Sequence, residues 1–284
     1  MMWKMLRHIG KTHRRKLAAT FGLVGLENLL LLVYPTFGGL AINAVIEGNT
    51  WLALLYALVV LMMWLVGALR RSMDTRTFTH IYTEIAVPVV LDQRHRQTPH
   101  SAITARVALS REFVSFFEEH LPMAATSLVS VFGACVMLLL LEFWVGVAAV
   151  AVLLVFLWLL PHFASISDSL YYRLNNRLEK DNHFIRHGSE TQLWKHYHLV
   201  GRLRVLISNR EALGYLAVGI AMSLLFGLAF TWMTVRGHGS AGHVYSITTY
   251  LWMFAMSLDD VPRLVEQYSN LKDIGRRVDL TQPA

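Results

Sequence analysis

Glu27 is a single carboxylate inside an apolar stretch of about residues 17–44. At 1.5 Å per helical residue it lies roughly 15 Å beyond the start of that stretch. An ionised carboxylate at the centre of a bilayer costs about 2.5–3.5 kcal/mol on the scale from insertion experiments. Glu27 is therefore expected to face a cavity, pair with a cation or be protonated. It could be a substrate or proton site, or it could make a structural hydrogen bond with Asn28 or another neighbour.

Asp259 and Asp260 form a second candidate proton site, just before Pro262. They lie about 15 residues into the last apolar stretch, where adjacent carboxylates beside a kink could gate a pathway or accept a proton. They are also close enough to the end of that stretch to be hydrated or paired with Arg263. Both interpretations stay open.

Histidines gather in the polar stretch of residues 165–210, at His183, His187, His196 and His198. The spacing of His183 and His187 places them on one face of a helix, which is compatible with metal binding. Since no carboxylate or thiol completes an evident ligand set, we predict neither a metal site nor a bound cofactor.

Enzyme motifs are incomplete or missing in the sequence. Gly10-Lys11-Thr12 is similar to the end of a phosphate-binding loop, but Met5 stands where that motif needs a glycine. Hydrolase and zinc-enzyme motifs do not occur in the sequence. We therefore predict that the chain is not an enzyme and carries no catalytic residues.

The composition indicates an integral membrane protein. The 284 residues are 55% hydrophobic and only 16% charged, against about 25% charged residues in soluble domains. The net charge of +7 could suggest nucleic acid, but cytoplasmic loops of membrane proteins carry the same excess, so we predict no nucleic-acid partner. Six apolar stretches are long enough to span a bilayer. They cover about residues 17–44, 51–69, 121–141, 145–163, 213–235 and 245–265.

The basic residues predict how these spans are oriented. Of 26 lysines and arginines, only Arg236 falls on the outer side of the predicted spans. Both termini are therefore predicted to be cytoplasmic, together with two long excursions of about residues 70–119 and 165–210. Because the excursions contain few helix breakers, we expect helices that extend the spans roughly 25–30 Å into water and reverse near Pro99–Ser101 and Gly188. Around the six-span domain of residues 17–265, residues 1–16 are predicted to form an amphipathic surface helix and 266–284 a cytoplasmic tail.

This layout resembles the transmembrane domain of ABC exporters. Ser101-Ala102-Ile103-Thr104-Ala105-Arg106 is similar to that family's Ser/Thr-Gly-x-hydrophobic-x-Arg segment, with Ala102 in place of the usual glycine. Leu121-Pro122 at the start of the third span and Arg276-Arg277 near the end of the chain also fit. The resemblance implies an all-α membrane fold of six transmembrane helices, in a domain-swapped homodimer whose fourth and fifth spans cross to the partner. It also implies coupling turns, at Pro99, His100, Ser101 and Arg106 and at Gly188, Ser189 and Glu190.

In that family an ATPase domain follows the tail, whereas this sequence stops at Ala284 without a complete phosphate-binding loop. The chain therefore looks closest to stand-alone six-span members without a nucleotide-binding domain. We expect a transporter or permease subunit in a bacterial inner membrane, which moves a peptide-like or amphipathic solute with a separate ATPase subunit. Two alternatives stay open. One is proton-driven transport without ATP through Glu27, Asp259 or Asp260, and the other is a regulatory or scaffold protein that does not transport.

Overall fold

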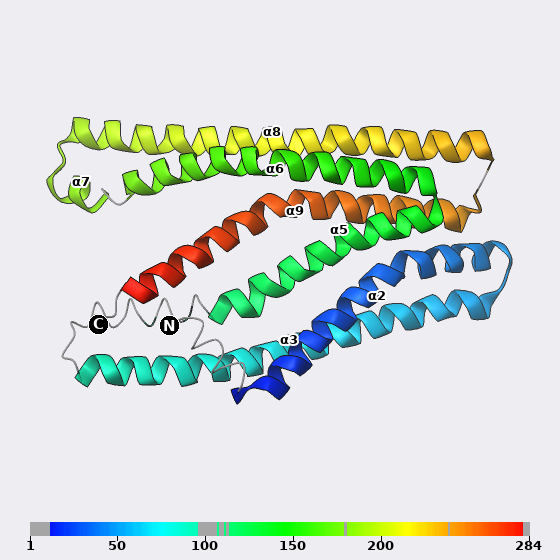
Figure 1. The fold of residues 1–284 in the computed structure, drawn as a ribbon, viewed down its shortest axis with the longest axis horizontal. Helices are drawn as coiled ribbons and strands as arrows, with labels where there is room; N and C mark the ends of the chain where they lie inside the picture. Colours follow the sequence, from blue (N-terminus) through cyan, green and yellow to red (C-terminus); the bar gives the residue numbers. More distant parts are fainter. Residues whose placement is uncertain are drawn as a thin grey trace. The chain divides into compact units, whose positions relative to one another are not determined.

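The computed structural model describes residues 12–95, 107, 111, 114–178, 181–237 and 239–280, and all secondary structure in these ranges is helical. The elements are α2 (Arg14–Ile46), α3 (Thr50–His95), the π-helical turn η1 (Phe116–His120), α5 (Leu121–Leu141), α6 (Phe143–Leu178), α7 (Asp181–His187), α8 (Glu190–Arg236) and α9 (Ala241–Leu280) (Figure 1). The predicted all-α class is confirmed.

Five stretches of the described helices are long and apolar enough to cross a membrane. They are α2, the Thr50–Pro88 part of α3, Phe116–Leu141, α6 and α8. The sixth predicted span, the first half of α9, is not among them because serine, threonine and tyrosine lower its hydropathy. Its hydroxyl groups are satisfied within the fold: Thr248 and Thr249 each donate to the carbonyl four residues earlier, at 2.8 Å. The side chains of Tyr250, Leu251 and Phe254 are fully buried, so protein rather than lipid surrounds this face of α9.

The chain folds as two compact units. The first comprises Met1–Met137 and Gly237–Ala284, and the second comprises Leu138–Arg236. Within the first unit α2 packs against both α3 and α9, and within the second unit α6 runs along α8 (Figure 1).

Small residues bring α2 and α9 into close contact in the first unit. A Cβ on Gly242 would overlap the carbonyl oxygen of Gly39, so both positions need glycine. The hydroxyl of Ser246 lies at 3.0 Å from the carbonyl oxygens of Pro35 and Gly242. The side-chain amide of Asn43 accepts a hydrogen bond from the Gly242 backbone N–H at 2.9 Å. These contacts fix the two helices next to the short turn between α2 and α3.

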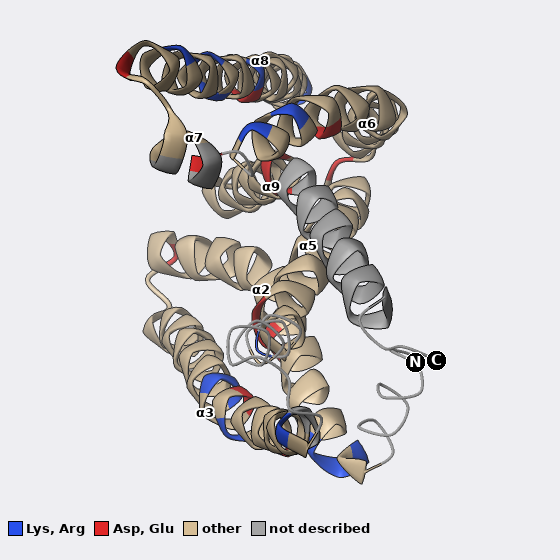
Figure 2. Cartoon of the chain, turned by 90° about the vertical axis from the view of Figure 1, so that its left-hand side faces the viewer, with Lys and Arg blue, Asp and Glu red and all other residues tan. Residues whose placement is uncertain are grey.

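The second unit is a long helical pair. Its contacts include the Arg210 guanidinium, 3.9 Å above the Phe163 ring, and Gly214, where a Cβ would lie 2.5 Å from the same ring. Further along, Leu174 of α6 packs with Val200 and Ile207 of α8. Since α8 has 47 residues, it is roughly 70 Å long, more than twice the thickness of a bilayer's hydrocarbon core. The helices thus extend well beyond a membrane, and the extensions of α3, α6 and α8 carry most of their basic residues (Figure 2).

In the second excursion α6 ends at Leu178 and α7 begins at Asp181, and residues 179–180 lie outside the described residues. The prediction of a continuous helix up to the turn at Gly188 therefore stays a prediction at this point. α7 folds onto α8. Asp181 and the buried His196 are joined by a hydrogen bond of 2.5 Å, and the ring centroids of Phe184 and His196 lie 4.5 Å apart.

Other boundaries shift by smaller amounts. Most of the predicted N-terminal surface helix, residues 1–11, lies outside the described residues, and α2 already begins at Arg14. α3 continues through Pro88 to His95 without interruption. The predicted boundary between the last span and the tail falls within α9, which is continuous to Leu280.

Candidate functional site

Glu27 pairs with a cation, which is one of the three arrangements expected from the sequence. Its carboxylate forms an ion pair with the Arg70 guanidinium of α3. Nη1 of Arg70 also donates to Oδ2 of Asp74, one helical turn further on, at 3.0 Å. A Cβ at Gly67 would lie 3.2 Å from Oε1 of Glu27, so the small residue lets the carboxylate approach α3. Glu27, Arg70 and Asp74 together form what we call the Arg70 network.

Helix geometry places Glu27 and Arg70 at similar distances from the turn between α2 and α3. Glu27 is about 28 Å from the end of α2 at Ile46, and Arg70 is about 30 Å from the start of α3 at Thr50. These distances match the roughly 30 Å of a hydrocarbon core. A hydrocarbon core of that thickness starting at the turn between α2 and α3 would have Glu27 and Arg70 at its other boundary.

The Arg70 network is largely shielded from solvent. The side chains of Glu27, Arg70 and Asp74 are 28%, 20% and 6% exposed. Among the described residues, Oδ1 of Asp74 has no hydrogen-bond partner, and neither does Oδ1 of the neighbouring buried Asn28. A second arginine–carboxylate pair, Arg111 and Glu118, approaches to 4.0 Å, and Glu118 is close enough to Asp74 for their negative charges to interact. Glu27, Asp74 and Glu118 thus lie around two arginines, Arg70 and Arg111.

Asp259 and Asp260 have different surroundings. Oδ2 of Asp260 accepts a hydrogen bond of 3.3 Å from the hydroxyl of Ser127 on α5, whereas Asp259 is exposed. Arg263 belongs to the part of α9 whose side chains are not described. Asp260 lies about 28 Å from the start of α9 at Ala241, which equals the distance of Glu27 from the end of α2 at Ile46. Of the two adjacent carboxylates, only Asp260 has a side-chain partner among the described residues.

The second predicted coupling turn is well defined. The Gly188 N–H donates to the carbonyl of Phe184 at 2.8 Å, and a Cβ on Gly188 would lie 2.5 Å from that same oxygen. The Ser189 N–H donates to the side-chain oxygen of Gln192 at 3.0 Å, which is the return bond of a capping box and starts α8. Glu190 then places a negative charge at the helix N-terminus, where it is favourable. Of the other predicted turn, Pro99, His100, Ser101 and Arg106 lie outside the described residues.

His196 and His198, two histidines of the second excursion, have different surroundings in the part of the chain that the structure describes. His196 is buried against Asp181 and Phe184 and stabilises the packing of α7 on α8. His198 is exposed, and the side chain of His183 lies outside the described residues. The pair of His183 and His187, whose spacing is compatible with metal binding but for which no metal site was predicted, therefore lies partly outside the described side chains.

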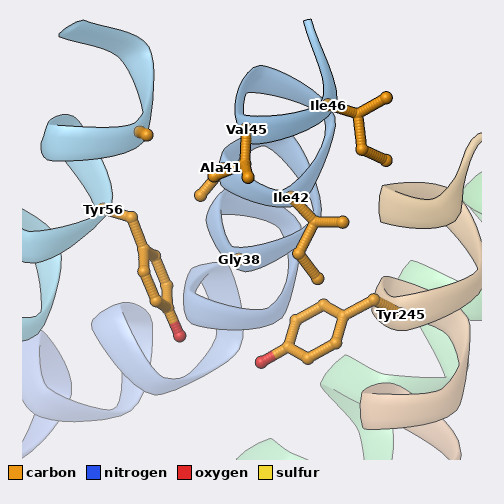
Figure 3. A pocket seen from close by; sticks show the side chains of 8 residues that line it. Gly38, Ala41, Ile42, Val45, Ile46, Tyr56 and Tyr245 are labelled. Atoms are coloured by element: carbon orange, nitrogen blue, oxygen red, sulfur yellow. The ribbon is translucent and has the colours of Figure 1, made fainter. Parts of the chain in front are cut away.

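A cavity of about 380 Å³ lies in the first unit at the opposite end of the helices from the extensions. The rings of Tyr56 on α3 and Tyr245 on α9 face it from two sides (Figure 3). The remaining lining residues are apolar, and they are Gly38, Ala41, Ile42, Val45, Ile46 and Ala53. The polar side-chain groups among these lining residues are the hydroxyls of the two tyrosines. The cavity therefore suits a hydrocarbon group with at most a small polar end.

Two members of the Arg70 network were missed as site residues from the sequence. In the sequence Arg70 was only the first residue of the predicted first excursion, and Asp74 was not singled out. A usable signal was present, since an arginine and an aspartate four residues apart share one helix face. Arg70 and Asp74 come directly after the apolar stretch of residues 51–69, which lies beside the stretch of residues 17–44 that contains Glu27.

The comparisons with known proteins agree with this architecture. A family profile described as ABC transporter transmembrane region matches residues 6–242, which is most of the chain. The chain belongs to this family. A comparison with curated proteins found no match.

Solved structures show the same fold for this member of the ABC transporter transmembrane family. One is described as the structure of a bacterial Atm1-family ABC exporter with ATP bound, at 16% sequence identity and a TM-score of 0.63. The superposition covers 94% of this chain and 54% of the exporter chain. The chain thus spans about half the length of that exporter, and the likeness concerns the fold. The predicted ABC exporter-type transmembrane fold is confirmed.

Proposed function

We propose that the chain is the membrane subunit of a transporter that moves a peptide-like or amphipathic solute across a bacterial inner membrane. The observation that carries this proposal is the length of the helices, in a chain whose family is that of ABC transporter transmembrane regions. α3 and α8 have 46 and 47 residues, while a bilayer needs about 20. A helix of that excess length serves to bring a turn far out into the cytoplasm, where an ATPase can act on it.

In this proposal the turn of Gly188, Ser189 and Glu190 is a coupling turn. It lies about 45 residues from the far end of α8, so it is remote from the lipid and reachable by a soluble domain. The turn at Pro99, His100, Ser101 and Arg106 would be the second docking point. The ATPase would be a partner subunit, and both termini would be cytoplasmic because the basic residues lie on that side.

The proposal includes a homodimer in which α6–α8 cross to the partner chain. It is supported by the division of the chain into two compact units, one of which is the α6–α8 pair. Large apolar side chains such as Trp158, Tyr215 and Leu224 are 79%, 70% and 71% exposed on that unit, so lipid or a partner must cover them.

Proton-driven transport is the second candidate, and the Arg70 network favours it. The network holds two carboxylates on one arginine, and with Arg111 and Glu118 it can still accept one positive charge. That charge could be a proton or the positive group of a solute. Asp259 and Asp260 are a further candidate pair for the same role.

Purification from native membranes in a mild detergent tests the first candidate. We expect an ATPase subunit to copurify with the wild type and to be lost with Glu190→Lys. The control is Arg204→Glu, an exposed charge reversal on the same helix about 21 Å from Glu190. Equal ATPase recovery from both variants would remove the turn from the docking site.

Uptake into liposomes under an imposed pH gradient tests the second candidate. Glu27→Gln keeps the shape and hydrogen bonding of the protonated acid, so it should abolish proton-driven uptake while leaving expression and dimerisation intact. Wild-type rates in this variant would exclude Glu27 from proton coupling. A chain that neither recruits an ATPase nor transports under a pH gradient would be the scaffold protein that the sequence also allowed.

A further inference from the structure

Three potential metal ligands meet where the chain enters α2. His13 immediately precedes that helix, and His80 and Glu84 lie one turn apart on the extension of α3. Nε2 of His13 lies 2.6 Å from one carboxylate oxygen of Glu84, and Nε2 of His80 lies 3.2 Å from the other. One ligand atom from each residue falls within 4.8 Å of the other two.

These distances are close to those that a metal ion would impose. Zn²⁺ binds imidazole nitrogen and carboxylate oxygen at about 2.0–2.2 Å in a tetrahedral arrangement, so its ligand atoms are roughly 3.3–3.5 Å apart. Nε2 of His80 already lies at about that distance from Oε1 of Glu84. Nε2 of His13 is 2.6 Å from the other oxygen, Oε2, so this contact must widen by less than about 1 Å for an ion to enter. The imidazole planes of His13 and His80 are inclined at 81°, so the two rings approach the centre from different directions.

We propose that His13, His80 and Glu84 form a binding site for one divalent transition metal ion, with Zn²⁺ the best match. Two imidazoles and one carboxylate are the donors that such ions prefer over Mg²⁺ or Ca²⁺, which take oxygen ligands. Three protein ligands leave the fourth tetrahedral position to water. This site is independent of the transport function proposed above.

Exposure and charge around the site fit a reversible ion. His13 is 7% exposed, which fixes its ring, while His80 and Glu84 are about half exposed and let the ion enter from solvent. Glu84 lies about 51 Å along α3 from Thr50, roughly 20 Å beyond the hydrocarbon core, so the ion would come from the water on that side. The positive charge of Lys16 acts on Glu84 and opposes a cation, which favours moderate over very tight affinity.

A bound ion would tie two parts of the chain together. His13 belongs to the segment that leads into α2, and its partners belong to α3, about 70 residues away in sequence. The ion would replace the single hydrogen bond of His13 to Glu84 with metal–ligand bonds. The start of α2 would then be held more firmly on the extension of α3 when the metal is present.

The test is Zn²⁺ titration of the purified full chain in detergent, followed by cobalt substitution. We expect one ion per chain and the intense visible absorption of tetrahedral Co²⁺. Glu84→Gln keeps a hydrogen-bonding group beside His13 but removes the charged ligand, and it should weaken binding by at least about 10–100-fold. His80→Ala should do the same, and the control His198→Ala, an exposed histidine on α8, should bind as the wild type.

Hydrogen exchange gives a second measurement that does not depend on affinity. Zn²⁺ should slow amide exchange near residues 14–17 and 80–84 in the wild type and leave it unchanged in Glu84→Gln. Equal affinity in the wild type and Glu84→Gln would overturn the proposal. So would a cobalt spectrum of octahedral type, which would mean that ions bind to scattered surface groups.

Discussion

Replacing Arg70 by methionine tests whether one arginine holds the carboxylates of α2 and α3 together. Methionine keeps the length and apolar stem of the side chain and removes the charge. Arg70 bonds both Glu27 and Asp74. Loss of Arg70 therefore leaves two carboxylates close together with no shared cation. This destabilises the fold more than the loss of either acid alone.

The expected magnitude follows from burial. Removing one partner of a fully buried ion pair costs about 3–5 kcal/mol, whereas exposed pairs contribute about 0.2–1 kcal/mol. Asp74 is only 6% exposed, so the cost of losing its ion pair lies near the upper range. Glu27 is 28% exposed, so the cost of losing its ion pair is smaller because solvent screens the charges. Because Asp74 can take up a proton and so limit the loss, we expect a cost of roughly 2–4 kcal/mol. The midpoint temperature of thermal unfolding shifts by about 2–4 °C per kcal/mol, so it should fall by roughly 5–15 °C.

The assay is thermal unfolding in detergent, followed by tryptophan fluorescence, with Arg71→Met as the matched control. Arg71 is the adjacent arginine and is exposed, so its replacement should cost no more than about 0.5 kcal/mol. The double variant Arg70→Met/Asp74→Asn should recover part of the loss, since the buried charge left behind is removed. Equal midpoints for Arg70→Met and Arg71→Met would refute the proposed network.

Three further predictions concern packing and topology. Gly39→Ala should lower the free energy of unfolding by about 1–3 kcal/mol, because the added methyl group forces α2 away from α9. Gly22→Ala on the same helix has open space around it and should be neutral or stabilising, and the thermal unfolding midpoints of the two variants are compared. His196→Ala should speed amide exchange in α7 by about tenfold or more because Asp181 loses its buried partner, and exposed His198 is the control. A reporter fused after the C-terminus should be active only in the cytoplasm, and activity on the other side would reverse the topology.

The long helices could be predicted from the sequence because apolar stretches and basic flanks are local signals. The first half of α9 was also predicted as a span, although it is not among the described helices apolar enough to cross a membrane. The structure shows how its hydroxyl groups are bonded. Tyr250, for example, donates a hydrogen bond of 2.7 Å to the carbonyl of Leu32 on α2. Such bonds remove the cost of placing a polar group in an apolar environment.

The partners of charged residues could not be predicted, because they depend on which helices are neighbours. Nothing near Glu27 in sequence indicates Arg70, which belongs to another helix. The pairing of Asp181 with His196 on α8 could not be predicted for the same reason. Periodicity and breakers describe a helix by itself, and these features arise from the contact between two helices.

Transport measured on the purified protein tests the central claim, that this chain is a transporter subunit, most directly. Proteoliposomes containing the complex from mild detergent would be supplied with fluorescent amphipathic peptides and either ATP or an imposed pH gradient. We expect ATP-dependent movement of peptide across the bilayer, lost with Glu190→Lys and retained with Arg204→Glu. Failure of every peptide to move under both energy sources, in a sample that is dimeric and folded, would contradict the claim.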